Sequence, residues 1–219
     1  SPPSKPQTEA PAAPAPAAPP QPPAPNPQPL TPPSPQPLAP SRSPVPPDAA
    51  LAPAVKLAGE MFKDEYDKAN SPAALTALAK TILQKVGEIQ SDIPARFVFL
   101  RLARDVAGKA GDSATAFEAI DRLGEAFEID PWEMKAAVMS SVAKLTRKPA
   151  ERKQFAQEVL TLMNQALEAD AFVVAEQTSK LALAEGTKLR DKEIIASARE
   201  GAKQAEQAAK AYEPVEAAL

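Results

Sequence analysis

The clearest pattern in the chain lies at residues 71–89, SPAALTALAKTILQKVGEI. Its large aliphatic side chains recur every three or four positions, at Leu75, Leu78, Ile82, Val86 and Ile89. That spacing puts them on one face of a helix, opposite a polar face. Ser71 followed by Pro72 is typical of a helix start, because serine caps free N–H groups and proline fits the first turn. The stretch therefore predicts an amphipathic helix with one buried face.

The next stretch predicts a helix in the interior of the fold. After Asp92, the run FVFL at residues 97–100 and the apolar residues up to Ala107 cover most of a helix circumference. Such a helix contacts neighbours on several sides. Ala110-Gly111-Asp112 then predicts a tight reversal, in which the glycine ends one helix and the aspartate caps the next.

Helical periodicity and helix-start signals continue on both sides of this pair. We expect Asp48 to cap a first helix that runs to about Ala69, with Val55, Phe62 and Tyr66 near its inner face. Later helices and turns are expected after Asp112, at Asp130-Pro131, at Pro149, at Ala169-Asp170 and at Glu185-Gly186-Thr187. The last helix is expected from Leu189 to about Tyr212, and the alanines on its contact face are Ala198, Ala202, Ala205 and Ala209.

The predicted fold class is all-α, because no stretch alternates as a strand does. About eight helices joined by short turns favour an irregular array of helical hairpins, either a tetratricopeptide-like solenoid or a bundle. The reversals before Asp112 and before Asp170 lie 58 residues apart, each preceded by an apolar helix and followed by an alanine-rich one. The consensus residues of tetratricopeptide repeats are missing at their places, so the predicted array is irregular.

The first 47 residues have a different composition from the rest. They hold 21 of the 27 prolines, and their only large aliphatic residues are Leu30, Leu38 and Val45. Proline removes backbone donors, and so few apolar side chains cannot offset the entropy of ordering the segment. We therefore expect a disordered Pro/Ala-rich linker at residues 1–47 and one helical domain at residues 48–219. Pro37–Arg42 matches the PxxPxR pattern of SH3 ligands. A segment so rich in proline produces this pattern by chance, so we favour a simple tether.

Composition excludes several kinds of chemistry. The chain contains no histidine and no cysteine, so it cannot build a Ser-His-Asp triad, a Cys-His pair, a disulfide or a zinc site with the usual nitrogen or sulfur ligands. We predict no catalytic, cofactor-binding or metal-binding residue and no enzyme. No apolar run is long enough to span a membrane. The chain starts at Ser1 rather than methionine, so we expect a processed chain or a fragment.

The charge pattern argues against nucleic acid as a partner. Lys and Arg total 25 against 28 Asp and Glu, a net charge of −3. Nucleic-acid binding needs a basic face instead. The densest basic stretch is Arg147, Lys148, Arg152 and Lys153. It straddles the expected helix start at Pro149, so we interpret it as a solvated helix end rather than a phosphate site.

Two sets of residues are candidates for a site. The acidic set Glu60, Asp64, Glu65 and Asp67 could hold a cation. However, Lys63 with Asp67 and Asp64 with Lys68 form opposite-charge pairs four residues apart, as solvated helix faces do. The aromatic set Phe97, Phe99 and Trp132 could line a ligand groove. Aromatic residues at helical spacing are more often core residues, so packing is the favoured interpretation.

Several short motifs resemble a helical region common in large uncharacterised exported proteins of planctomycete-type bacteria. They are VPPDAA at 45–50, EMFKDEY at 60–66, ARFVFLRLARD at 95–105, and AGD at 110–112 with AID at 119–121. The resemblance covers most of residues 45–219. It implies a spacer or interaction block in an exported or cell-envelope setting, on the periplasmic side, and a cytoplasmic location stays open. It implies no catalytic residue.

The sequence thus leaves two functions. The favoured one is a non-enzymatic scaffold, protein-interaction or spacer module of a larger envelope-associated or exported protein, carried on a proline-rich tether. The alternative is a helical domain that binds a metal through carboxylates alone, or an apolar ligand. A protein partner or neighbouring domains are expected, without nucleic acid and without membrane insertion. The oligomeric state stays open.

Overall fold

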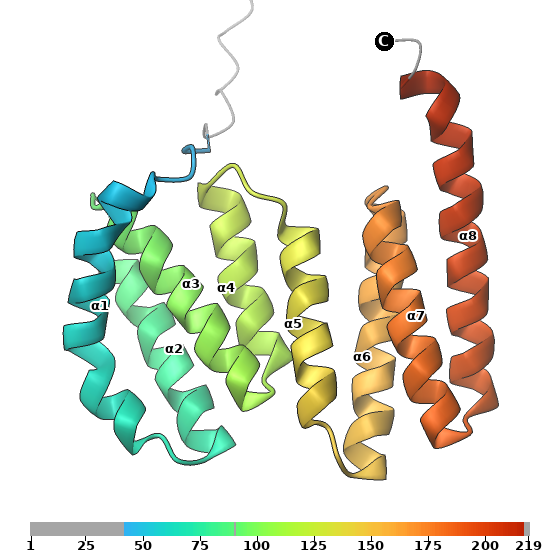
Figure 1. Cartoon of the computed structure of the whole chain (residues 1–219), viewed down its shortest axis with the longest axis horizontal. Coiled ribbons are helices and arrows are strands. Elements are labelled where there is room, and N and C mark those ends of the chain that lie inside the picture. The colour runs from blue at the N-terminus through green and yellow to red at the C-terminus, as the bar shows by residue number, and fades with distance from the viewer. Residues whose placement is uncertain (1–41, 90, 217–219) are drawn as a thin grey trace, which may run out of the picture. The chain divides into compact units, whose positions relative to one another are not determined.

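The computed structural model describes residues 42–89 and 91–216. Residues 1–41 of the expected linker, which hold all but the last residue of its SH3-type motif, lie outside the described residues. In the described ranges every regular element is an α-helix and no strand is present, so the all-α prediction is confirmed. The eight helices are α1 (Asp48–Lys68), α2 (Pro72–Glu88), α3 (Ile93–Ala110), α4 (Ser113–Ala126), α5 (Pro131–Leu145), α6 (Pro149–Glu168), α7 (Phe172–Leu189) and α8 (Lys192–Glu216) (Figure 1).

Consecutive helices run antiparallel, joined by short turns (Figure 1). The odd-numbered helices form one continuous row, in which α3 contacts α1 and α5, and α5 contacts α7. The even-numbered row is more open: α2 packs on α4 and α6 packs on α8, whereas α4 and α6 are linked by a hydrogen bond that Ser113 Oγ donates to Glu158 Oε2 at 2.8 Å. The expected irregular array of helical hairpins is confirmed.

Short polar side chains start four of these helices as predicted. Ser71 Oγ accepts a hydrogen bond from the Ala74 N–H at 3.2 Å. A carboxylate does the same at three further starts, where Asp92, Asp112 and Asp130 accept from N–H groups of the first turn at 2.8–3.0 Å. Each bond satisfies a donor that the helix itself leaves free. These helix starts depend on local chemistry, which is why the sequence could predict them.

The reversal at Gly111 also has the predicted form. Gly111 has φ 79°, a left-handed conformation that glycine adopts without strain. The Asp112 N–H donates to the Ala107 carbonyl at 3.0 Å, and the Gly111 N–H donates to the Gly108 carbonyl at 3.2 Å. This pair of bonds is the Schellman motif, and it places Asp112 to cap α4.

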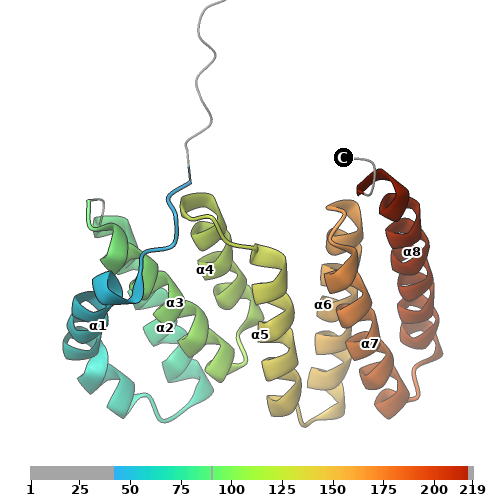
Figure 2. The same ribbon diagram turned by 45° about the horizontal axis from the view of Figure 1, so that its top comes forward.

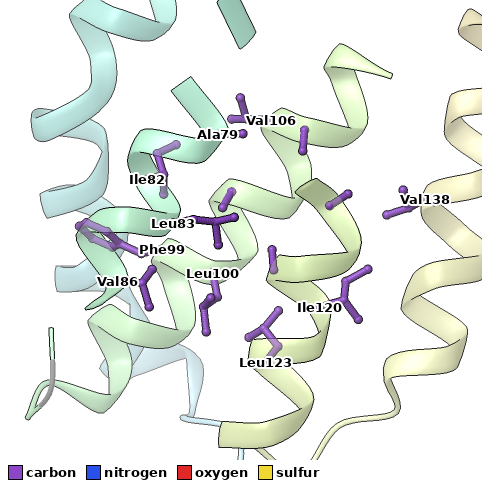
Figure 3. Packing of buried hydrophobic residues seen from close by; sticks show 14 of the residues in the cluster. Ala79, Ile82, Leu83, Val86, Phe99, Leu100, Val106, Ile120, Leu123 and Val138 are labelled. Carbon is purple, nitrogen blue, oxygen red and sulfur yellow. The ribbon is translucent and has the colours of Figure 1, made fainter. Parts of the chain in front are cut away.

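The core is centred on α3, as its apolar circumference predicts. Phe99 and Leu100 have no exposed surface, and they belong to one apolar cluster with Ile82 of α2 and Ile120 of α4 (Figure 3). Phe99 meets the ring of Phe62 on α1 edge to face, with centroids 5.6 Å apart. One apolar cluster therefore joins α1 to α5, and residues of α6, α7 and α8 extend it.

The start of α1 and its inner face differ from the prediction. Pro47 is the N-cap, and Asp48 is the first helical residue rather than the cap. The buried stripe consists of Leu51, Ala54, Ala58 and Phe62. Val55, expected near the inner face, is 57% exposed, and Tyr66 is 37% exposed. The reason is tertiary: α1 packs mainly on α3 and only slightly on α2, so apolar side chains on both flanks of its buried stripe stay exposed.

The turn predicted at Glu185-Gly186-Thr187 is wrong, because these residues lie inside α7. The helix ends at Leu189, and the reversal follows at Arg190, which has φ 56°. Gly186 instead permits close packing, since a Cβ atom built on it would lie 2.8 Å from Cγ2 of Ile194 on α8. The glycine thus marks a helix contact rather than a helix end.

The last helix also differs in detail. It starts at Lys192 rather than at Leu189, because Leu189 still belongs to α7, and it runs to Glu216. Of the four alanines expected on its contact face, Ala198 and Ala205 are buried and Ala209 is exposed. Gly201 contributes to this face instead, where it packs against Met163 of α6.

The segment ahead of α1 is attached to the helical array. The Ser43 N–H donates to the Ala126 carbonyl, and the Glu128 N–H donates to the Ser43 carbonyl, both at 2.9 Å. Pro46 is buried, and the segment passes the connection between α4 and α5 (Figure 2). A domain boundary at residue 48 stays a prediction, but these contacts tie residues 43–46 to the helices.

Candidate functional site

An open groove lies beside α1, between α1 and α3 with α2 behind it. We call it the α1–α3 groove, and its volume is about 630 Å³. The α1 residues that line it are Leu51, Val55, Ala58, Gly59, Phe62, Lys63, Tyr66 and Asp67. The remaining lining residues are Leu78 and Ile82 of α2, and Val98, Arg101, Leu102, Asp105, Val106 and Lys109 of α3.

The floor of the groove is apolar because three helices present core residues there. Val98 and Val106 of α3 and Ile82 of α2 are buried at its base. On the α1 side, Val55 and Tyr66 are exposed next to the buried stripe of that helix. These two side chains extend the apolar surface of the groove beyond the buried stripe.

The rim of the groove is charged, and much of the charge is cationic. Lys63 extends from α1, and Arg101 and Lys109 extend from α3. Lys109 Nζ donates to the Tyr66 hydroxyl at 2.8 Å and lies 5.2 Å from the centre of its ring. Asp105 is already neutralised, because Arg104 contacts its carboxylate at 2.6 Å.

None of the three groove cations pairs with a carboxylate in the described part of the chain. Lys109 has Tyr66 as its partner, and the Arg101 guanidinium lies 5.6 Å from the ring centre of Phe97. Asp67 is the one rim carboxylate outside an ion pair within the described ranges. The rim therefore carries an excess of positive charge over an apolar floor.

A second hollow lies on the other side of α3, between α3 and α5. Its volume is about 720 Å³, and it shares Asp105 and Lys109 with the α1–α3 groove. Met134, Val138 and Leu145 of α5 contribute its apolar part. The two hollows lie side by side on the row of odd-numbered helices, so that row offers a hollowed face over α1, α3 and α5.

The acidic residues proposed from the sequence do not form a cluster. Glu60, Asp64, Glu65 and Asp67 are all exposed on α1. Glu60 pairs with Lys56 at 3.8 Å. The expected Lys63–Asp67 and Asp64–Lys68 pairs are not formed in the described residues. Over the same ranges, no three acidic side chains are grouped as ligands of a metal ion.

The aromatic candidates pack in the interior, which agrees with the favoured interpretation. Phe97 and Phe99 are both buried, and Phe97 meets Phe127 edge to face at 4.9 Å. Trp132 packs partly buried against the apolar clusters, with Lys135 Nζ 5.2 Å from its ring centre. None of these aromatic residues lines the α1–α3 groove.

The basic stretch near Pro149 is a solvated helix end, as expected, at Arg147, Lys148 and Lys153, which are exposed, but not at Arg152. Arg152 is largely buried and contacts the buried carboxylate of Glu185 at 2.6 Å. Lys148 pairs with Glu151 and Lys153 pairs with Asp191. Arg152 and Lys153 are thus balanced by carboxylates from distant parts of the sequence, whereas the partner of Lys148 lies three residues further along the chain.

Sequence reasoning missed the groove. Its signal was the width of the apolar surface on α1, where Leu57 and Met61 are exposed on one flank of the buried stripe and Val55 on the other. A helix with a single inner face needs a narrower apolar surface.

No helix in the described ranges is long and apolar enough to cross a membrane. No family model, curated protein or solved structure matches the chain.

Proposed function

We propose that the helical part is a non-enzymatic protein-interaction module that binds a segment of a partner protein in the α1–α3 groove. The observation that carries this proposal is the uncovered apolar flank of α1, where Val55 and Tyr66 stand exposed beside a floor of core residues. Removal of this apolar surface from water by a partner favours a complex. The charged rim then orients the partner.

The size of the groove supports a peptide segment as the occupant. On α1 the lining residues run from Leu51 to Asp67. At 1.5 Å per residue that distance is about 24 Å, or roughly four helical turns. A groove of this length accommodates several side-chain anchors in a row, as peptide-binding grooves do. The exported or envelope setting and the spacer role rest on sequence resemblance alone, and we propose them on that ground.

Two tryptophan variants test the proposed function. Gly59 lines the groove, and a Cβ built on it meets no atom within 4 Å, so Gly59→Trp fills the groove while the helix can still form. Gly87 is an exposed glycine on α2, outside the groove, and it has equal space around it. Gly87→Trp is therefore the matched control.

The measurement is selection of random displayed peptides of about 16 residues against the full chain. We expect selected peptides to bind the wild type and Gly87→Trp equally and to bind Gly59→Trp at least about tenfold more weakly, a loss of about 1.4 kcal/mol. If no selected peptide distinguishes the two variants, the proposed function is wrong. If an apolar dye binds in a Gly59-dependent way and no peptide does, the groove belongs to an apolar ligand instead.

A further inference from the structure

We infer that the segment that fills the α1–α3 groove is an acidic amphipathic helix of the partner. This inference rests on the proposed function and specifies the chemistry of the occupant. It follows from two features of the groove, namely the positive charge of its rim and the lack of free backbone groups in its walls.

Cations stand on both walls of the groove. Lys63 on α1 and Arg101 and Lys109 on α3 are three positive groups, against one rim carboxylate outside an ion pair among the described residues, Asp67 on α1, so the rim keeps a net positive charge. None of the three is paired with a carboxylate in the described residues, and Asp105 is already occupied by Arg104 at 2.6 Å. Carboxylates on the partner supply the missing counter-charges, and complementary charge favours that partner over a basic one.

The helical walls of the groove favour a helix over a peptide that pairs as a strand. The walls consist of α1, α2 and α3, whose backbone N–H and C=O groups bond within their own helices. A peptide bound by strand addition needs an open strand edge with which to pair its backbone, and no strand exists in the described ranges. Backbone groups that are buried without a partner are costly. An occupant that satisfies its own backbone, as a helix does, fits the groove.

The apolar floor sets the pattern of the partner helix. Val55 and Tyr66 on one wall and Leu102 on the other form the contact surface along the groove. A helix presents apolar side chains to such a floor at spacings of three and four residues. Its acidic residues flank that stripe and reach the rim. The expected ligand is thus a helix of roughly four turns with an apolar stripe and acidic flanks.

The test uses the full chain and three synthetic peptides of about 16 residues. The first has an apolar stripe at helical spacing with glutamate on both flanks. The second has the same stripe with lysine in place of glutamate. The third has the composition of the first in an order without helical periodicity. Binding is measured by fluorescence anisotropy at low and high salt, and peptide helicity by circular dichroism on binding.

We expect the acidic amphipathic peptide to bind at least about tenfold more tightly than the other two, and more weakly at high salt, because salt screens exposed charges. The double charge reversal Lys63→Glu with Arg101→Glu should weaken it by at least about tenfold. Lys192→Glu with Lys203→Glu, on exposed α8 residues outside the groove, changes the net charge equally and should have little effect.

The outcomes separate this inference from the proposed function. If the lysine peptide or the non-periodic peptide binds as tightly as the acidic one, the inference is overturned. The proposed function still holds in that case, provided that peptides selected from the random library bind in a Gly59-dependent way. Equal weakening by the groove and the α8 charge reversals also overturns it, because the effect is then one of net charge. If no peptide from either source depends on Gly59, both fail.

Discussion

Arg152 on α6 donates a hydrogen bond through Nη1 to Oε2 of Glu185 on α7 at 2.6 Å. Glu185 has no exposed surface, and its other oxygen accepts from Lys188 Nζ at 2.5 Å. Arg152 also donates through Nη2 to the Thr146 carbonyl at 3.0 Å. The guanidinium therefore links α7 to the connection between α5 and α6, and a buried carboxylate depends on it.

Replacement of the arginine should destabilise the fold strongly. Arg152→Met keeps the apolar stem but leaves Glu185 with one counter-ion, Lys188, which is more than half exposed. Removal of one partner of a buried ion pair costs about 3–5 kcal/mol. We expect a loss of that order in the free energy of unfolding, measured by urea titration with circular dichroism.

The matched control is Lys153→Met on the same helix. Lys153 pairs with Asp191 at 3.2 Å and is more than half exposed. An exposed ion pair contributes less than about 1 kcal/mol. Equal losses for the two variants would contradict the role assigned to the buried pair.

Gly186→Ala should destabilise the protein although alanine is the better helix former. Alanine improves helix propensity by about 1 kcal/mol. Its Cβ would lie 2.8 Å from Cγ2 and 3.2 Å from Cβ of Ile194, and overpacking of this kind costs about 1–3 kcal/mol. We expect a net loss of about 1 kcal/mol in urea unfolding. Ile194→Ala should cost less in the Gly186→Ala background than in the wild type, because it removes the clash. Additive losses would show that the contact is not the cause.

Gly59→Ala should have the opposite sign. A Cβ at this exposed position of α1 meets no atom within 4 Å, so only the gain in helix propensity remains. We expect a gain of about 0.5–1 kcal/mol in the free energy of unfolding. A loss would mean that the backbone at Gly59 is constrained by something other than the helix.

Asp112 should make the stability depend on pH in the acid range. Partial burial acts to raise the pKa of Asp112, but the hydrogen bonds from the N–H and hydroxyl of Thr115, together with the Thr76 hydroxyl and the charge of Lys80, lower the pKa below its ordinary value. A carboxyl with a lowered folded-state pKa stabilises the fold above its unfolded-state pKa of about 3.9. The contribution is lost as the pH falls through the folded-state value.

Asp112→Ala should therefore cost about 1 kcal/mol at neutral pH, as the loss of an N-cap does, and less at about pH 2.5. The measurement is urea unfolding of wild type and variant at both values. Asp64→Ala, at an exposed position of α1, should change little at either. A cost for Asp112→Ala that is the same at both pH values would contradict the stabilising role of the ionised carboxylate.

Ser43→Pro should weaken the attachment of the segment ahead of α1. Proline has no N–H, so the 2.9 Å bond to the Ala126 carbonyl is lost. We expect a destabilisation of about 1 kcal/mol and faster hydrogen exchange at the Glu128 amide, which donates to the Ser43 carbonyl. Unchanged exchange at Glu128 would show that this pairing does not persist in solution.

Most of the fold could be predicted because helix starts are local. Ser71, Asp92, Asp112 and Asp130 each accept from N–H groups two or three residues ahead, so a short window of sequence contains the whole interaction. The sequence also predicted the interior position of α3, because apolar residues cover most of the circumference of this helix.

The glycine at position 186 shows where local reasoning fails. Glycine ends a helix at Gly111, where φ is positive, but it continues α7 at position 186, where α8 lies close. The actual reversal uses Arg190 in a left-handed conformation, which glycine usually takes. Only the position of Ile194 on the next helix distinguishes the two uses of the same residue type.

The amino-acid sequence by itself determined the number of helices, most of their starts and the absence of histidine and cysteine chemistry, because each depends on residue types a few positions apart. The tertiary structure decided how much of the apolar surface of α1 stays exposed, and with it the α1–α3 groove. Val55 and Phe62 lie one heptad apart on the same helix, yet Phe62 is buried and Val55 is 57% exposed. That difference arises because α1 packs mainly on α3 and only slightly on α2. Helix packing of this kind depends on residues that are distant in the chain.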